Sequence, residues 1–394
     1  MLGLKEYNEL NNNSKKKKIG IFIGGKPNYY SASSYIRLLS PLNELSNEFS
    51  IYIINNETHK QFLNDLENNK KSINIIIIER DIFDRSNLKE TFIKTLFKKL
   101  KENNIKIIFD IDDDLLNIDE THPSYEEYSK INNILTFIIK NSNLITVSTN
   151  HLKKTLIKLN EKIIVIPNTL LKTWAFNSNN KINNLNSKKI IKIGYFGTRS
   201  HGEDIKIIKQ SFENAKNKLN NKTIIFEIIG VSYDTYDWAT KIDIPNNYKN
   251  NPNTKERMKN FIQYFFNKFN LFPSQLQYPN FVNWMKNEID WDIAVAPLED
   301  SNINRSKSNL KYLEYTAMNI PCIYSDIGPY KDIKDKKTGL IVENKTECWT
   351  NAIINLIEDE ELYKTILKNA YEDVEENYLV ENATSIWKKV LDGF

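Results

Sequence analysis

The sequence predicts an α/β protein made of two doubly wound domains that face a cleft. Short runs of isoleucine, valine and phenylalanine alternate with amphipathic stretches along the chain. These runs are continuous in hydrophobicity, which is typical of parallel strands covered on both faces. The alternation stops at the polar stretch from Asn177 to Lys189 and then restarts. Because 394 residues suffice for two domains of ordinary size, we interpret this stretch as a linker between two β/α series.

The first series defines an N-terminal domain over residues 1–175. Amphipathic helices are expected over Ser34–Leu45 and Leu88–Asn103. The strands are expected near Ile19–Ile23, Ile51–Ile54, Asn74–Ile78, Lys106–Ile111, Leu144–Val147 and Ile163–Ile166.

The second series defines a C-terminal domain over residues 190–378, followed by a last helix, Val380–Leu391, within residues 379–394. The segment from Tyr233 to Trp291 is longer than one crossover helix, and we expect helices near Thr254–Asn270 and Asn280–Asn287 there. The strands are expected near Ile191–Phe196, Ile224–Ile229, Asp292–Ala296, Pro321–Tyr324 and Gly339–Val342.

The composition argues against several classes of protein. The net charge of +4 is small for this length, and the six arginines form no basic stripe, so a nucleic-acid partner is not expected. Four histidines and two separated cysteines show no metal-ligand spacing and no disulfide framework. The N-terminus lacks the apolar core of a signal peptide, and no run of about 18 apolar residues spans a membrane. A reducing, cytoplasmic setting is the simplest interpretation.

The lysine-rich helix expected over Leu88–Asn103 has two interpretations, contact with a membrane surface and exposure to solvent. Five lysines and Phe92, Leu96 and Phe97 fit peripheral contact with an anionic membrane, at its inner face. The commoner meaning of such a pattern is a solvated helical face.

The most informative stretch follows the apolar run Asp292–Leu298. At about 100° per residue, Lys307, Lys311 and Glu314 share one face of a helix. Ser306 or Ser308 is expected to cap this helix, whose free N–H groups would attract an anion together with Arg305 and the lysines. A carboxylate one turn deeper suits sugar hydroxyls, so the stretch indicates a nucleotide-sugar site. The alternative is an ordinary surface helix with a Lys–Glu pair.

Two other loops follow expected strands and contain glycine. Gly24 and Gly25 allow close approach of the backbone to a substrate, and Tyr29 and Tyr30 can stack against a sugar ring. A plain tight turn is the alternative interpretation, and the absence of GxGxxG gives no support to a dinucleotide cofactor.

The loop after Ile191–Phe196 contains Gly197, Thr198, Arg199 and His201. Arg199 can clamp a diphosphate with two parallel hydrogen bonds, and the hydroxyl and imidazole groups are its polar neighbours. Glycine-flanked turns with a chance arginine are also common.

The acidic run Asp110–Asp114 follows the strand segment Lys106–Phe109, and three roles are open for it. It can hold a metal, bind or deprotonate an acceptor hydroxyl, or cap the next helix through Asp114. We favour acceptor binding or capping over metal. His122 is a further candidate beside this run, and Arg80 forms either an ion pair with acidic neighbours or a substrate contact.

These motifs resemble the GT-B glycosyltransferases of retaining family 4, the glycosyl transferases group 1. The family signature is a Glu, seven residues, a second Glu, a small-residue turn and Pro-Val-Ile. Glu314 stands at the second Glu, with Pro321-Cys322-Ile323 after it, whereas Ser306 replaces the first Glu, which usually touches the donor sugar. The version found here is similar to a subgroup from bacterial surface-polysaccharide and glycoprotein glycan clusters.

The resemblance implies a role for each motif. The donor is a nucleotide-diphosphate sugar and no cofactor or metal is needed; the acceptor is a glycan, a lipid-linked glycan or a glycoprotein. Glu314 would hold the ribose, and Arg199 and Lys307, with Lys311 as a further cation, would neutralise the leaving diphosphate. Asp112 and Asp113 would orient the acceptor, while the last helix would cross back to the N-terminal domain. The loop Gly328, Pro329 and Tyr330 would approach the donor.

Two alternatives belong to other functional classes. A nucleotide-sugar 2-epimerase has a similar two-domain fold. A noncatalytic sugar-nucleotide or glycan-binding protein would explain the serine at position 306. The sequence does not indicate the oligomeric state.

Overall fold

The computed structural model describes residues 4–10, 15–25, 30–68, 70, 73–80, 82, 89–120, 122, 124–171, 173, 185–197, 201–230, 240–241, 278, 282, 285–286 and 289–394. The helix expected over 254–270, most of the one over 280–287 and the linker residues 177–184 lie outside this set. The chain divides into two compact units. Unit 1 comprises Met1–Leu171, Arg305–Ser308 and Tyr378–Phe394; unit 2 comprises Lys172–Asn304 and Asn309–Asn377.

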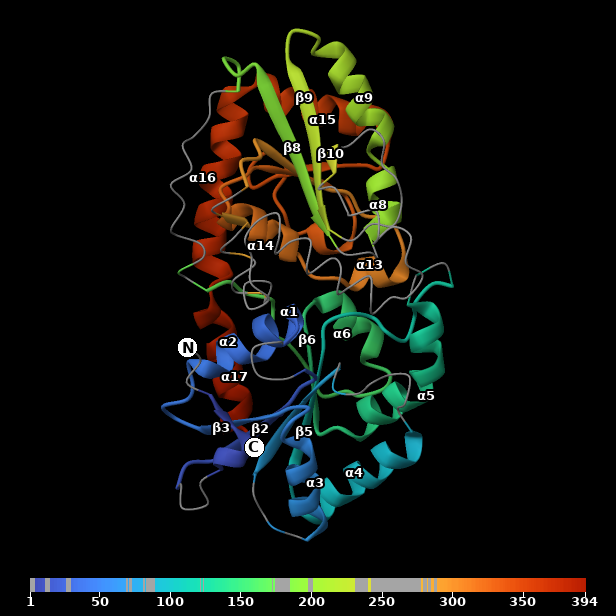
Figure 1. The fold of residues 1–394 in the computed structure, drawn as a ribbon, viewed down its shortest axis with the longest axis vertical. Coiled ribbons are helices and arrows are strands. Elements are labelled where there is room, and N and C mark those ends of the chain that lie inside the picture. Colours follow the sequence, from blue (N-terminus) through green and yellow to red (C-terminus); the bar gives the residue numbers. More distant parts are fainter. Residues whose placement is uncertain are drawn as a thin grey trace. The chain divides into compact units, whose positions relative to one another are not determined.

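Unit 1 contains a seven-stranded parallel sheet in the order β1-β3-β2-β4-β5-β6-β7 (Figure 1). Its strands are β1 (Lys5–Glu6), β2 (Lys18–Phe22), β3 (Ser50–Ile54), β4 (Ile75–Glu79), β5 (Lys106–Ile111), β6 (Leu144–Val147) and β7 (Ile163–Val165). Its helices are η1 (Tyr7–Glu9), α1 (Ala32–Ser34), η2 (Tyr35–Leu39), α2 (Ser40–Asn43), α3 (His59–Glu67), α4 (Glu90–Glu102), α5 (Tyr125–Asn141), α6 (Asn150–Leu156) and α17 (Val380–Asp392). Because every residue of β4 is buried, the sheet is covered on both faces, which explains its continuous run of isoleucines.

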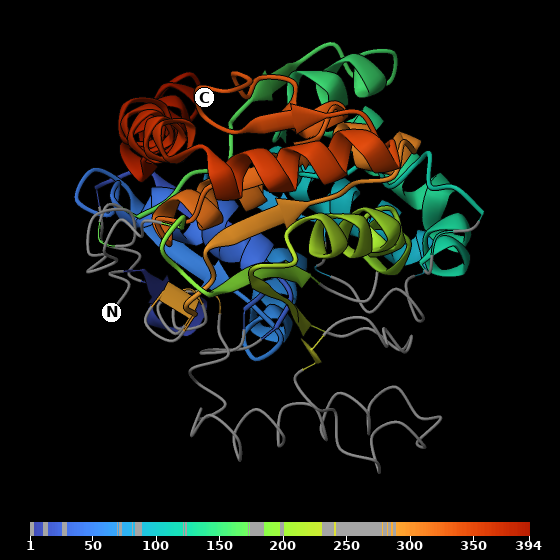
Figure 2. The same cartoon turned by 90° about the horizontal axis from the view of Figure 1, so that it is seen from above.

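Unit 2 contains a six-stranded parallel sheet in the order β10-β9-β8-β11-β12-β13. Its strands are β8 (Ile190–Gly197), β9 (Thr223–Gly230), β10 (Thr240–Lys241), β11 (Ile293–Ala296), β12 (Cys322–Ser325) and β13 (Leu340–Val342). Its helices are α8 (Gly202–Lys206), α9 (Lys209–Lys218), α13 (Asn302–Ser306, which ends in unit 1), α14 (Leu310–Ala317), η5 (Gly328–Tyr330), α15 (Thr346–Glu358) and α16 (Glu360–Asn377). Helix α15, orange-red in Figure 2, lies against β12 and β13.

The predicted fold class is confirmed, and all eleven expected strands are present within one or two residues of their predicted bounds. The two-residue strands β1 and β10 were not predicted, because so short a segment carries no periodic pattern. The helix expected over Ser34–Leu45 is interrupted by one π-helical turn, η2.

A glycine at position 194 allows an indole to lie on the second sheet. A Cβ atom built on Gly194 would approach the Trp291 ring to 1.7 Å, which no side chain tolerates. Trp291 is buried there and donates from Nε1 to Glu227 Oε2 at 2.9 Å. Because Gly194 has no side chain, Trp291, which lies at the end of the segment before β11, can pack directly against β8.

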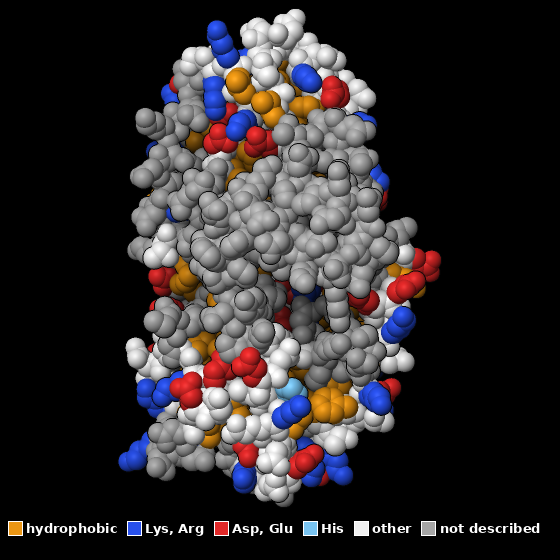
Figure 3. Space-filling view, viewed as in Figure 1, with side chains coloured by type: hydrophobic (Ala, Val, Ile, Leu, Met, Phe, Trp, Pro, Cys, Tyr) orange, Lys and Arg blue, Asp and Glu red, His pale blue; other side chains and the backbone are white. Residues whose placement is uncertain are grey.

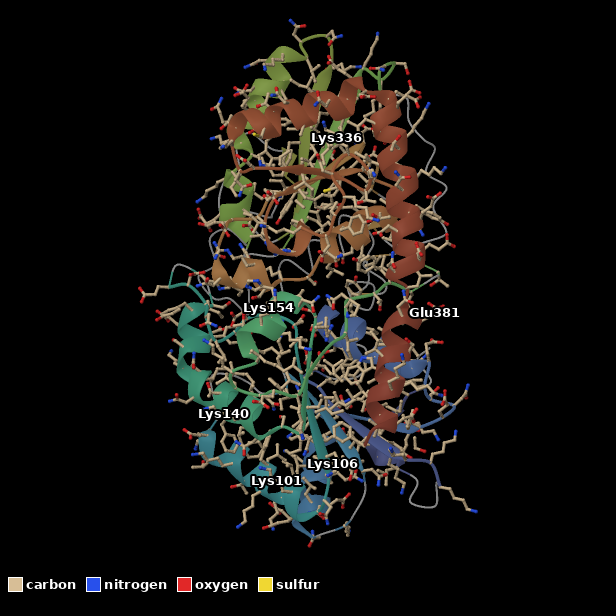
Figure 4. The ribbon with its side chains drawn as sticks, turned by 180° about the vertical axis from the view of Figure 1, so that it is seen from behind. Lys101, Lys106, Lys140, Lys154, Lys336 and Glu381 are labelled. Atoms are coloured by element: carbon tan, nitrogen blue, oxygen red, sulfur yellow. The ribbon has the colours of Figure 1, made fainter. Side chains whose placement is uncertain are left out.

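The described surface is mixed in charge. On the face drawn in Figure 3, basic and acidic side chains are interspersed among the residues that the structure describes. On helix α4, Lys94 pairs with Glu90 at 2.6 Å, and Lys99 pairs with Glu102 at 3.2 Å. Lys101, at the end of this helix, lies at the outer surface in Figure 4 and donates to Asn141 Oδ1.

These i,i+4 and i,i+3 pairs are typical of a solvated helical face, so the structure gives no support for membrane contact through α4. Within the described residues, no helix is both long enough and apolar enough to cross a bilayer.

The C-terminal helix α17 is held on unit 1 beside α2 (Figure 1). Trp387 is fully buried and donates from Nε1 to the carbonyl of Arg37 at 3.1 Å. Thr384 Oγ1 donates to the carbonyl of Pro41 at 3.0 Å, and Lys17 Nζ donates to that of Leu391 at 2.8 Å.

We predict that Trp387→Ala lowers the free energy of unfolding by about 3–5 kcal/mol, because it leaves a large cavity and removes a buried hydrogen bond. Urea unfolding followed by circular dichroism measures this loss. Phe394→Ala, which changes a side chain 37% exposed on the same terminal segment, is the control and should cost little. Equal losses in the two variants would contradict the packing role of Trp387.

Candidate functional site

Helix α14 places a buried carboxylate in unit 2. Glu314 is 3% exposed, and its Oε1 accepts a hydrogen bond of 2.9 Å from the Tyr278 hydroxyl. Burial raises the pKa of Glu314 to about 7, although the charge of Lys311 and the bond from Tyr278 oppose this. A ligand that donates hydrogen bonds to Glu314 would favour its ionised form.

Lys311 lies one turn before Glu314 and reaches the carboxyl end of β8. Its Nζ donates to the carbonyl of Phe196 at 2.9 Å and lies 4.9 Å from the centroid of the Tyr195 ring. The Phe196 ring centroid is 5.0 Å from the same ammonium. Ligands of open α/β sheets bind at this end of the strands, so a carbonyl and two aromatic faces hold a cation where a ligand would bind.

The expected cap of α14 is wrong. The helix begins at Leu310 with Asn309 as its N-cap residue and has no side-chain cap. Ser306 instead ends α13, and Ser308 Oγ accepts a hydrogen bond from Asn168. Lys307 therefore lies in the connection between two helices and not on one helical face with Lys311 and Glu314.

The segment Arg305–Ser308 belongs to unit 1, although the residues on both sides of it belong to unit 2. Arg305 is exposed and Lys307 is half-buried. Ser306 is fully buried, its carbonyl accepts from Thr149 Oγ1 at 3.0 Å, and its Oγ has no hydrogen-bond partner among the described residues. The residue in place of the first family Glu is thus an interior one in this structure.

The loop after β8 contains a histidine–carboxylate pair. His201 Nδ1 lies 2.7 Å from Asp204 Oδ2, and the other oxygen, Oδ1, accepts the Glu299 backbone N–H at 2.6 Å. Asp204 was not predicted as a site residue, because it and Glu203 are ordinary acidic residues for the first turn of a helix such as α8. Gly197 ends β8, while Thr198 and Arg199 lie outside the described residues.

The loop after β12 forms the short helix η5. Gly328 begins it with a φ of 40°, a conformation that favours glycine. Pro329 is buried, and the Tyr330 ring lies 4.9 Å from that of Tyr324, in the interior. Any donor contact from this loop would therefore come mainly from its backbone.

In unit 1, the acidic run after β5 meets two arginines. Asp110 forms a buried ion pair with Arg37, with Oδ1 at 2.7 Å from Nη2. Asp112 and Asp113 both pair with Arg80, at 2.9 and 2.7 Å. Among the described residues, the carboxylates that pair with Arg80 thus come from the segment that follows β5.

The prediction that Asp114 caps the next helix is wrong. Its Oδ1 accepts the backbone N–H groups of Leu116 and Asn117, at 3.3 and 3.2 Å, in a turn. The next helix, α5, begins only at Tyr125.

A metal site was one of the roles considered for the acidic run Asp110–Asp114. Among the described residues, no group of three or more His, Cys, Asp or Glu side chains is placed to hold a metal ion. The run's first carboxylates face guanidinium groups instead, an arrangement suited to holding hydroxyl groups in a fixed geometry.

Asp112 is the member of the run with the most perturbed ionisation. Burial raises its pKa to about 6, and the repulsion of Asp113 adds to this while Arg80 opposes it. Ser33 Oγ donates to Asp112 Oδ2 at 3.0 Å, and Ser148 Oγ donates to its carbonyl at 2.8 Å. The carboxyl end of β5 is therefore polar, and serines on two other segments bond to Asp112 there.

The remaining predicted residues of unit 1 lie as follows. Gly25 lies in the bend after β2 with a φ of 89°, and its carbonyl accepts from the N–H of Asn56, which follows β3. Gly24 precedes it in the same bend, and Tyr29 lies outside the described residues.

Tyr30 and His122 are both engaged in local contacts. The Tyr30 ring is 8% exposed and lies edge-on to Tyr35, while its hydroxyl donates to Glu6 Oε1 at 3.1 Å. Stacking of this ring on a sugar would need it to leave the interior. His122 Nδ1 accepts the Ser124 backbone N–H at 3.1 Å, in the turn before α5.

Comparison with known proteins agrees with this architecture. Residues 283–359, which include Glu314, match the family glycosyl transferases group 1. Among curated proteins, no sequence relative was found.

Solved structures share the fold at low identity. HepE from Anabaena, in complex with UDP and glucose, is 12% identical with a TM-score of 0.59, over 96% of this chain and 100% of that one. Sucrose-phosphate synthase from Thermosynechococcus elongatus is 12% identical with a TM-score of 0.60, over the same shares. These structures decide the fold. It is GT-B.

A third GT-B structure is longer than this chain. TarM from S. aureus, in complex with UDP and alpha-GlcNAc-glycerol, is 17% identical with a TM-score of 0.52. The similarity covers 84% of this chain and 57% of TarM.

We predict that Asp112 makes stability fall with rising pH. Its pKa in the folded state is about 6, above the usual value of 3.8, so the folded state binds more protons between these values. The free energy of unfolding should fall, relative to that of Asp112→Asn, as pH rises from about 4 to about 6.5, by on the order of 1–3 kcal/mol.

Urea unfolding at four pH values in this range measures the difference. Asp326→Asn, a change at an exposed carboxylate of unit 2, is the control and should keep the pH profile of the wild-type protein. Parallel pH profiles for the wild-type protein and Asp112→Asn would refute the prediction.

Proposed function

We propose that the protein is a glycosyltransferase that moves a sugar from a nucleotide-sugar donor to an acceptor hydroxyl. One observation carries the proposal. A buried carboxylate, Glu314, and an ammonium one turn before it, Lys311, lie at the carboxyl end of the second sheet. This pair lies inside the region that matches glycosyl transferases group 1, in a chain with the GT-B fold.

The donor would bind through its nucleotide. The ribose hydroxyls donate to Glu314, and the diphosphate meets Lys311 and Lys307, with Arg199 as a third cation. HepE and TarM were solved with UDP, so we propose UDP as the nucleotide of the donor.

The chemistry breaks the bond between the anomeric carbon and the phosphate oxygen. The electron pair of this bond leaves with the nucleotide diphosphate, and positive charge develops on the sugar. Lysines that stabilise the charge of the leaving group lower this barrier without a metal ion. The departing phosphate oxygen takes the proton of the acceptor hydroxyl, so the new bond forms with retention and no protein base is needed.

Unit 1 would bind the acceptor, and we propose a glycan or a glycan carried by lipid or protein. Asp112 and Asp113 are held by Arg80 at the carboxyl end of β5, where they can accept hydrogen bonds from sugar hydroxyls. TarM was solved with alpha-GlcNAc-glycerol and HepE with glucose, which is consistent with a carbohydrate acceptor.

A noncatalytic nucleotide-sugar-binding protein is the second candidate, and Ser306 favours it. The residue in place of the first family Glu is a fully buried serine, so one usual donor contact is missing. Release of UDP from UDP-glucose or UDP-N-acetylglucosamine, with a glycosylated product by mass spectrometry, supports transfer. Binding without turnover across a panel of glycan acceptors supports the second candidate.

We predict that donor affinity rises with pH through the ionisation of Glu314. Its pKa is about 7, and ribose hydroxyls bind the ionised carboxylate better, so the dissociation constant for a UDP-sugar should fall between pH 6 and 8. Glu314→Gln should bind about tenfold more weakly and lose this dependence.

Tyr278→Phe is the matched variant for this experiment. It removes the hydrogen bond that lowers the pKa of Glu314, so the midpoint of the affinity profile should move to higher pH. Calorimetric titrations at five pH values measure all three proteins. An unchanged profile in Glu314→Gln would exclude Glu314 from donor binding.

We predict that Lys307→Ala lowers kcat by about 100-fold or more, because it removes a cation that stabilises the leaving diphosphate. The melting temperature should change little, since the side chain is only half-buried. Lys154→Ala, an exposed lysine on α6 labelled in Figure 4, is the control and should keep normal turnover. Normal turnover in Lys307→Ala would remove this residue from the mechanism.

A further inference from the structure

Lys307 lies between two residues whose positions are held by hydrogen bonds within unit 1. On its N-terminal side, the carbonyl of Ser306 accepts from Thr149 Oγ1 at 3.0 Å. On its C-terminal side, Ser308 Oγ accepts from Asn168 Nδ2 at 2.7 Å. Both sequence neighbours of this lysine are thereby restrained, Ser306 through its carbonyl and Ser308 through its hydroxyl.

The two donors are themselves held by rigid parts of unit 1. Thr149 is the N-cap residue of α6, and its Oγ1 also accepts the backbone N–H of Leu152 at 3.2 Å. Asn168 is 4% exposed, and its Oδ1 accepts from Arg37 Nη1 at 3.2 Å. Arg37 is in turn fixed by its buried ion pair with Asp110.

We propose that Thr149 and Asn168 are positioning residues that set where the Lys307 ammonium lies during the reaction. This inference rests on the proposed function. A lysine ammonium reaches only the points within the length of its stem, so the place of the backbone that carries it limits where the charge can lie. Electrostatic stabilisation of a leaving group requires a charge that is already in place when the bond breaks.

A chain of contacts thus runs from the interior of unit 1 to the proposed catalytic cation. It begins at Asp110, passes through Arg37 and Asn168, and ends at Ser308, next to Lys307. None of the first three side chains needs to touch the donor for its loss to affect turnover. A displacement of the ammonium by about 1 Å is enough to reduce turnover substantially.

A double-mutant cycle tests the proposal. UDP release from UDP-glucose and UDP-N-acetylglucosamine is measured, with kcat and KM, for the wild-type protein, Asn168→Ala, Lys307→Ala and the double variant. We expect Asn168→Ala to lower kcat by about 10- to 100-fold with little change in KM. In the Lys307→Ala background the same substitution should change kcat by less than about twofold, because the residue through which it acts is gone.

The position of Thr149 allows a conservative rescue. Thr149→Val keeps the shape of the side chain but removes the hydroxyl, whereas Thr149→Ser keeps the hydroxyl and both of its hydrogen bonds. We expect the valine variant to lose kcat in the same Lys307-dependent way and the serine variant to retain it. If Asn168→Ala fails to fold, the double-mutant cycle with Lys307→Ala is measured with Thr149→Val, and Thr149→Ser is its control.

Thr384→Val controls for general loosening of unit 1. Thr384 Oγ1 donates to the carbonyl of Pro41 at 3.0 Å, and neither residue belongs to the chain of contacts from Asp110 to Ser308. The effect of this substitution on kcat should therefore not depend on Lys307.

The outcomes separate this inference from the proposed function. Equal effects of Asn168→Ala with and without Lys307, or full activity in both Asn168→Ala and Thr149→Val, overturn the inference and leave the transferase proposal standing. A wild-type protein that binds no nucleotide sugar and releases no nucleotide overturns the proposed function, and the inference falls with it.

Discussion

The buried ion pair between Arg37 and Asp110 is the constraint on which unit 1 depends. Both side chains are inaccessible to water, and two hydrogen bonds of 2.7 and 3.1 Å join them. A charge buried in this way is costly unless its partner stays in place, so each element that carries a member of the pair is held in position. Arg37 also donates to the carbonyl of Ile166 and accepts from Trp387 at its own carbonyl, which joins the helical segment after β2 to β7 and to α17.

Two buried carboxylates of unit 2 differ in the partners that they contact. At the amino end of β11, Asp292 is fully buried and bound by Lys188 Nζ at 2.5 Å and by the Lys192 backbone N–H at 2.9 Å. At the carboxyl end, Glu314 is equally inaccessible, but burial outweighs its partners and raises its pKa to about 7. A carboxylate whose partners satisfy it is structural, whereas one left close to neutrality gains from a ligand that donates hydrogen bonds.

The hydrophobic pattern of the sequence was enough to predict the strands, but it was not enough to predict the contacts of the candidate site. The runs near Ile75, Lys106 and Leu144 are apolar because both faces of their sheet are covered, so their bounds follow from the sequence. The cap of α14 did not follow, because Ser308 bonds to Asn168, 140 residues away in the chain. Arg80 and its carboxylate partners were all noticed in the sequence, but their pairing required the neighbouring positions of β4 and β5. Tyr278 and Asp204 gave no signal, since a tyrosine or an aspartate in a polar stretch is ordinary.

The sequence by itself determined the fold class, the places of the parallel strands and the helix that carries Lys311 and Glu314. Periodicity and hydrophobicity are local properties, and each segment carries its own. Only the tertiary structure decided which acids pair with arginines, that burial raises the pKa of Glu314 to about 7, and that Thr149 and Asn168 bind the two neighbours of Lys307, Ser306 and Ser308. Those results depend on burial and on hydrogen bonds between residues far apart in the chain, and neither quantity exists until the chain has folded.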